Sequence, residues 1–293
     1  MKKYFLFVIA SLLLLYSCTE VINVKLPSSD KKISIEGSIE NGKFPEVIIT
    51  NSIGLFSSTS GATASNFYVT DAKVYVSNGV ITDTLKLTID STSSLGLVYK
   101  GTSIIGAVGH NYSLKVVASN GKVYTATTSI PTPIALDSVW WIKQPPNDTL
   151  GFANAHLSDP PGLGNNYRWY AKRPTKDRRF IAPPGATFDD KLIDGKSFDF
   201  AYTKGYDPTD NVHSEKNDPD SEKGYYRKKD TIYIKFCSID RASKDFYTTF
   251  ETALSSNGNP FASPVTILTN IEGGALGVWA GFGATYDTIM PTP

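Results

Sequence analysis

Cysteine is almost absent from this 293-residue chain, which contains only Cys18 and Cys237. Two cysteines cannot supply a thiolate metal cluster or a framework of several disulfides. If Cys18 carries a lipid, as the N-terminal sequence discussed below indicates, Cys237 has no disulfide partner left within the chain. The stability of the protein must therefore come from a packed core.

Histidine is equally scarce, since only His110, His156 and His213 are present, and no two of them stand at metal-ligand spacing. The chain also lacks a Gly-x-Ser-x-Gly elbow, and its glycine-rich ending (273–277) lacks the Lys-Ser/Thr pair of a phosphate-binding loop. A single thiol in an apolar strand, such as that of Cys237, is usually an inert core group. We therefore predict a protein that is not an enzyme and uses no metal or cofactor.

An excess of charge of either sign is missing as well. The chain has 29 Lys and Arg residues against 28 Asp and Glu residues, for a net charge of +1. A chain this close to neutral has no electrostatic basis for binding nucleic acid. The acidic stretch Asp207–Glu222 contains interleaved lysines and lacks the ligand spacing of a helix-loop-helix calcium site. We favour a solvated loop there over a cation site.

The N-terminus carries an apolar run, Tyr4–Leu15, which follows Lys2-Lys3 and leads into Leu15-Tyr16-Ser17-Cys18. The run is shorter than a membrane-spanning helix, and a small residue precedes the cysteine, which is typical of a lipoprotein signal peptide. We predict a signal peptide over residues 1–17, a lipid on Cys18 and a lipidated tether over residues 18–32. The alternative is a plain secretory signal or a short membrane anchor.

Residues 33–131 read as a series of short strands. Runs with a period of two, such as Ala72–Val76 and Tyr112–Val117, are separated by glycine- and asparagine-containing turns. Asn78-Gly79 and Asn120-Gly121 supply the positive φ that tight hairpin turns require. We predict an antiparallel β-sandwich of immunoglobulin-like or transthyretin-like type.

Pro131-Thr132-Pro133 is predicted to be an extended connector, because alternate prolines remove sheet donors and stiffen the chain. Residues 132–293 are predicted to form a second β-rich domain. Its one expected helix lies between Asp240 and Leu254, where apolar residues recur at helical spacing. Long loops are expected between Arg173 and Gly224, which is rich in Pro, Gly, Asp and Lys.

Aromatic residues crowd this second domain, and their ring faces can stack on sugars or apolar nutrients. The alternative is that a helix-poor domain builds its core from them. Because long ordered loops are usually functional, we predict that a ligand or partner binds here. The candidate residues are Trp140, Trp141, Trp169, Tyr202, Tyr206, Tyr225 and Tyr226.

Several motifs together resemble a known family. The turn Asp159-Pro160, the triplet Asn166-Tyr167-Arg168, the pair Phe246-Tyr247 and the ending Asn270–Gly274 with Gly277-Val278-Trp279 are similar to Bacteroidota outer-membrane lipoproteins grouped as domain of unknown function 4249.

The resemblance implies a lipoprotein at the outer membrane, on either its periplasmic or its cell-surface face. It also implies association with a TonB-dependent receptor as an accessory in nutrient capture or gating. The family supplies no catalytic residues to carry over. The alternative function is a stand-alone surface adhesin or a glycan or peptide hydrolase.

We predict that Cys18→Ala moves the protein from the membrane fraction to a soluble or signal-retaining form, because two acyl chains on one cysteine give stable anchoring. Cell fractionation with immunoblotting measures the shift. Wild-type protein in the soluble fraction would contradict lipidation.

Overall fold

The computed structural model describes residues 32–51, 67–92, 96–207, 224–256, 261–263 and 265–290. The predicted signal peptide, Cys18, most of the tether, His213 and the acidic residues that follow Asp207 lie outside these ranges. The described residues belong to one compact unit, Lys31–Pro293. Within these ranges no helix has both the length and the hydrophobicity needed to span a bilayer.

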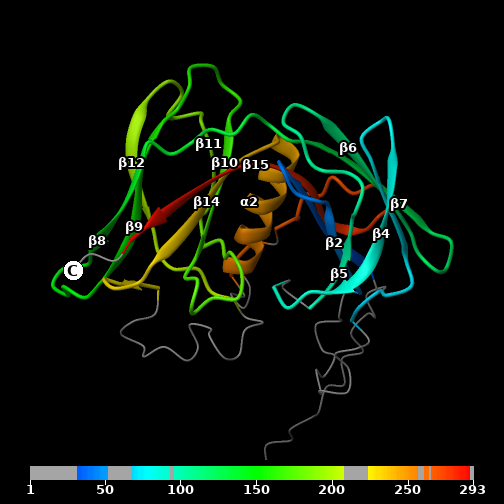
Figure 1. Cartoon of the computed structure of the whole chain (residues 1–293), viewed down its shortest axis with the longest axis horizontal. Helices are drawn as coiled ribbons and strands as arrows, with labels where there is room; N and C mark the ends of the chain where they lie inside the picture. Colours follow the sequence, from blue (N-terminus) through cyan, green and yellow to red (C-terminus); the bar gives the residue numbers. More distant parts are fainter. Residues whose placement is uncertain are drawn as a thin grey trace, which may run out of the picture. The chain divides into compact units, whose positions relative to one another are not determined.

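The described chain is mainly β, as predicted (Figure 1). The strands of the first half are β1 (Ile33–Glu40), β2 (Glu46–Asn51), β3 (Lys73–Ser77), β4 (Thr82–Ile89), β5 (Leu97–Lys100), β6 (Asn111–Val117) and β7 (Val123–Ser129). The second half contains β8 (Ser138–Lys143), β9 (Leu150–Ser158), β10 (Asn166–Lys172), β11 (Thr187–Asp189), β12 (Ser197–Tyr202), β13 (Tyr226–Arg227), β14 (Ile232–Ile239), α2 (Arg241–Ser256) and β15 (Leu276–Ile289).

These strands form two sheets. The larger is 11-stranded, in the order β11-β10-β14-β15-β1-β2-β5-β4-β3-β6-β7. In the 4-stranded sheet, β9 pairs with β12 and β13 along one edge and with β8 along the other. The smaller sheet therefore presents β8 as an edge strand.

The local predictions for hairpins and helix are confirmed. Asn78-Gly79 connects β3 to β4 and Asn120-Gly121 connects β6 to β7, with Gly79 at φ 87° and Gly121 at φ 83°. Helix α2 begins after Asp240, whose carboxylate accepts the backbone N–H of Ser243 at 2.8 Å. An aspartate at this position satisfies a donor that the first helical turn leaves unpaired.

Strand β15 supplies the feature that local patterns did not predict. Its first half pairs in parallel with β1, and its second half pairs antiparallel with β14. The sheet is therefore mixed, and it runs through both predicted domain ranges, 33–131 and 132–293. The division into two domains remains a prediction.

The glycines of β15 are explained by close approach of other backbone segments. A Cβ on Gly281 would lie 2.0 Å from the carbonyl oxygen of Ser129, and one on Gly283 would lie 2.2 Å from that of Pro131. The connector at Pro131-Thr132-Pro133 thus crosses directly over β15. Only a residue without a side chain leaves room for this crossing.

Three groups of buried side chains form the core. The first fills the space among β1–β7 and includes Trp279 of β15. The second lies between the smaller sheet and strands β10 and β14, and it includes Trp169 and Phe236. The third lies beneath α2 and contains Phe246 and Cys237.

We predict that Gly277→Ala weakens folding by roughly 1–3 kcal/mol. Gly277 has φ +111°, and an added Cβ would lie 1.9 Å from the carbonyl oxygen of Ile35 in the paired strand β1. Urea unfolding of the variant measures the loss. Gly274→Ala is the matched control, because Gly274 also has a positive φ (+83°) but only the Lys122 ammonium lies within 4.0 Å of its added Cβ. Equal losses in the two variants would contradict a steric role for the β1–β15 contact.

Candidate functional site

The free thiol of Cys237 is unsuited to act as a nucleophile. Its side chain is fully buried, and burial raises its pKa to about 12. The thiolate, which is the reactive form, is therefore scarcely populated at neutral pH. This agrees with the core role that the sequence indicates.

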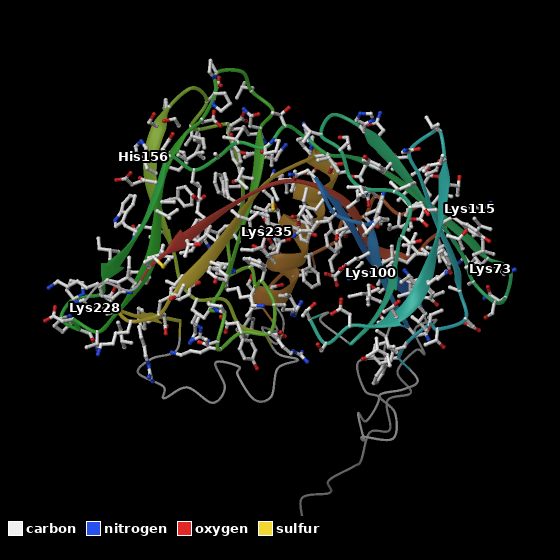
Figure 2. All side chains as sticks on the ribbon, viewed as in Figure 1. Lys73, Lys100, Lys115, His156, Lys228 and Lys235 are labelled. Carbon is white, nitrogen blue, oxygen red and sulfur yellow. The ribbon has the colours of Figure 1, made fainter. Side chains whose placement is uncertain are left out.

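A buried ion pair joins β1 to β14 beside Cys237. Lys235 of β14 lies 2.5 Å from Glu40 of β1, and Lys43 lies 2.7 Å from the same carboxylate. The hydroxyl of Tyr286 in β15 also donates to Glu40. Burial by itself would raise the pKa of Glu40, but the charge and hydrogen bond of Lys235, with hydrogen bonds from Lys43 and Tyr286, hold it below its usual value of 4.5. Figure 2 labels Lys235 at this position between the two halves.

Arg168, from the Asn-Tyr-Arg triplet, connects β10 to helix α2. Its guanidinium lies 2.6 Å from the carboxylate of Glu251 and 3.8 Å from the centre of the Tyr247 ring. Its Nε donates to the hydroxyl of Tyr170 at 3.0 Å. A buried arginine that is paired with a carboxylate and stacked on an aromatic ring fixes the helix in place. The pair Phe246-Tyr247 is thus part of the same contact.

The Asp-Pro turn is joined to the same triplet. Asp159 accepts hydrogen bonds from the hydroxyl of Tyr167 and from the backbone N–H of Gly195, the latter at 3.1 Å. Tyr167 is itself fully buried, and its ring stacks on Phe236 at 5.3 Å. These contacts give both motif residues a structural role.

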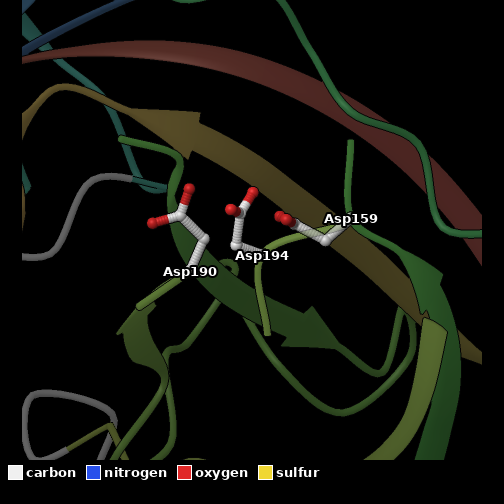
Figure 3. Close-up of side chains that lie close together, drawn as sticks. All are labelled: Asp159, Asp190 and Asp194. Atoms are coloured by element: carbon white, nitrogen blue, oxygen red, sulfur yellow. The ribbon is translucent and has the colours of Figure 1, made fainter. Parts of the chain in front are cut away.

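Three carboxylates converge next to this turn. Oxygens of Asp159, Asp190 and Asp194 lie within 4.8 Å of one another (Figure 3). Carboxylate oxygens are the ligands that calcium prefers. Here, however, Asp190 and Asp194 accept backbone N–H groups of the 162–165 turn at 2.6 to 2.8 Å. The cluster therefore orders this turn.

The Asn-Ile-Glu-Gly-Gly motif (270–274) fixes the segment that precedes β15. The side chain of Asn270 donates to the carbonyl of Trp279 at 2.8 Å and accepts its N–H at 2.9 Å. Glu272 is hydrogen-bonded to Thr125 of β7 through its backbone N–H at 2.8 Å and its carboxylate at 3.1 Å. The motif holds β7 and β15 together.

Four of the predicted aromatic site residues contribute to the core. Trp169 and Tyr226 are fully buried, with 0% and 1% of their surface exposed. Trp141 and Tyr202 pack against the same core from the inner face of the smaller sheet. The rings of Trp169 and Tyr226 are closed to a partner in this conformation, whereas Trp141 and Tyr202 are half-buried.

The other three predicted aromatic residues reach the surface. Tyr206 is 44% exposed and follows β12. Trp140 is half-buried on β8, on the face of the smaller sheet opposite to Trp141. Tyr225 is half-buried beside β13, and its ring lies 5.4 Å from that of Phe152.

Trp140 and Tyr225 belong to a partly exposed apolar surface on the outer face of the smaller sheet. Strand register pairs Ile142 of β8 with Phe152 of β9 on this face, and Ile142 is 46% exposed. We call the set Trp140, Ile142, Phe152 and Tyr225 the aromatic face. Ile142 and Phe152 were not singled out from the sequence, because only the β8–β9 register brings them together.

A row of polar residues crosses the same face. Ser138, His156 and Asp199 are directly opposite one another on β8, β9 and β12, and His156 Nδ1 lies 2.5 Å from Asp199 Oδ1. These are the residue types of a hydrolase triad. Among the described residues no hydroxyl is hydrogen-bonded to His156. The hydroxyl of Ser158, two residues further along β9, is hydrogen-bonded to that of Ser197 at 2.8 Å. The row therefore lacks the contact between nucleophile and base.

We predict that Lys235→Met destabilises the protein by about 3–5 kcal/mol at pH 7, because it leaves Glu40 as a buried charge without its closest partner. The control is Lys43→Met, which removes a partner that is 54% exposed and is expected to cost about 1 kcal/mol or less. Chemical denaturation measures both.

The pH chosen matters for this test. Because the pKa of Glu40 is lowered in the folded state, its contribution to stability is complete above its usual value of 4.5 and is lost as the pH falls through the lowered pKa. Equal losses for the two variants at pH 7 would contradict a special role for Lys235.

The comparison with protein families identifies a family that covers most of the chain. The sequence model of the family described as "Domain of unknown function (DUF4249)" matches residues 19–286. The chain belongs to this family. No curated protein matches the chain.

Proposed function

We propose that this member of the DUF4249 family is a lipid-anchored outer-membrane protein that acts as a non-enzymatic accessory of a TonB-dependent transporter. In this proposal it contacts its partner or a nutrient through the aromatic face. The observation that carries the proposal is the exposure of this apolar surface on an edge strand and its neighbour.

The composition of the aromatic face supports recognition. Exposed apolar patches on folded proteins mark interaction sites. Trp and Tyr supply a large contact area with few rotatable bonds, so little conformational entropy is lost when a partner binds. Ile142, at 46% exposure, adds apolar area beside Trp140.

The chemistry of the described residues supports a binding role over a catalytic one. The motif residues Asp159, Arg168 and Asn270 are engaged in contacts between elements of the fold. The thiol of Cys237 is buried, and His156 has no hydroxyl partner among the described residues. The lipid predicted on Cys18 would keep the binding surface at the membrane.

We predict that Trp140→Ser combined with Tyr225→Ser lowers recovery of the cross-linked TonB-dependent receptor by about tenfold or more, as expected when central aromatic contacts are removed from an interface. Affinity purification from outer membranes followed by mass spectrometry measures recovery.

The matched control removes exposed apolar side chains elsewhere. Ile105→Ser with Val108→Ser changes residues that are 55% and 40% exposed in the first half of the chain. All variants keep Cys18, so that anchoring is the same. Equal receptor recovery from the two double variants would remove the aromatic face from the proposal.

A further inference from the structure

A basic groove opens at one end of the smaller sheet. Its volume is about 540 Å³, and three segments line it: the start of β9, the segment that follows β10, and β13 with the turn after it. The charged residues of the lining are Arg173, Lys176, Arg227, Lys228, Lys229 and Asp230. Figure 2 labels Lys228 at this end of the molecule.

The positive charge of this groove is local. Among the described residues, the lining has five cations against one carboxylate, whereas the whole chain has 29 Lys and Arg residues against 28 Asp and Glu residues. Clefts lined by charge of one sign concentrate ions of the other sign. The groove therefore favours an anion in a protein that is otherwise balanced.

Nearby carboxylates are paired with cations of the groove lining and with the backbone of its turn. Asp177 is paired with Arg173 at 2.6 Å, and both side chains are buried. Asp230 accepts Lys176 at 2.6 Å and the backbone N–H of Arg227 at 2.9 Å, and it is also buried. These pairs fix part of the cationic wall.

Two lysines remain available for a ligand. Within the described part of the chain, the ammonium groups of Lys228 and Lys229 make no hydrogen bond or ion pair. Among the described acids, the exposed Asp148 interacts electrostatically with Lys228, and its carboxylate is paired with Lys143 at 2.7 Å. Both lysines stand on a tight turn closed by the hydrogen bond from Asp230 N–H to Arg227 O at 2.9 Å. The turn presents two adjacent positive charges in a fixed frame.

We propose that the basic groove binds a phosphate-bearing group. Several convergent cations suit a phosphate better than a single carboxylate, because a phosphate carries more charge and more acceptor oxygens. The volume is sufficient for a phosphate with an attached sugar or glycerol unit. Leu150 and Pro174 supply an apolar wall for such a unit.

The groove and the aromatic face are neighbours along the chain, because both use residues of β9 and of the segment around β13. Leu150 and Phe152 are two residues apart on β9, and Tyr225 is two residues before Arg227. A ligand with a phosphate and a sugar can therefore contact both surfaces. Phosphate binding does not rest on the transport proposal, because it requires neither the lipid anchor nor a receptor.

The test compares two sources of phosphate. The mature chain with Cys18→Ala in every sample excludes insertion of the acyl chains, and it retains the acids between Asp207 and Gly224. One arm titrates inorganic phosphate and pyrophosphate by calorimetry. The other measures flotation with vesicles of phosphatidylcholine alone or mixed equally with phosphatidylglycerol.

The variant is Lys228→Gln with Lys229→Gln, and the control is Lys73→Gln with Lys115→Gln. The control pair is exposed on β3 and β6 of the first half, where Figure 2 labels both lysines. Thermal melting checks that all proteins are folded.

We expect the affinity for the phosphate probe to fall about tenfold to thirtyfold in the Lys228/Lys229 variant, because each substitution removes one electrostatic contact with the phosphate. The affinity of the control is expected to stay unchanged. Lysine-dependent binding in the first arm identifies a soluble phosphate compound, and binding confined to phosphatidylglycerol vesicles identifies a lipid headgroup. Absence of binding in both arms, or equal loss in the two double variants, would overturn the proposal.

Discussion

Strand β15 is hydrogen-bonded to β1 over its first half and to β14 over its second half, and all three cores pack against it. Trp279 enters the first core, Ile289 the second, and Ala280 and Phe282 the third. The buried pair of Lys235 with Glu40 reinforces this arrangement where the three strands meet. Removal of β15 would open every core at once, so the two halves depend on one element.

The motif residues Asn270, Arg168 and Asp159 take part in contacts that hold the fold together. Asn270 positions Trp279, Arg168 fixes α2 over β14 and β15, and Asp159 holds Tyr167 in the core. The contact of Arg168 with Glu251 spans 83 residues of sequence, whereas the contacts of Asn270 with Trp279 and of Asp159 with Tyr167 span 9 and 8. The aromatic face and the basic groove are built on β8, β9 and β13, and β9 ends next to Asp159.

Sequence patterns predicted what depends on neighbouring residues. The turn at Asn78-Gly79 and the helix after Asp240 follow from local backbone preferences. The parallel pairing of β1 with β15 could not be predicted, because no local signal links Ile35 to Gly277 across more than two hundred residues. Adjacent residues on a strand face opposite ways, so Trp140 and Trp141 cannot both face the core, but only the register with β9 decides which one does. The basic groove could not be predicted for the same reason, since its three segments meet only in the folded chain.

The order of the chain along β15 has a consequence for folding. Strand β1 precedes β15 by more than two hundred residues, so the first core lacks Trp279 and Ile271 until β15 is in place. Until then, side chains of this core such as Ile35 and Tyr112 stay uncovered, and partly folded chains with such exposed apolar surface are prone to aggregate. A chain that lacks β15 keeps this apolar surface open.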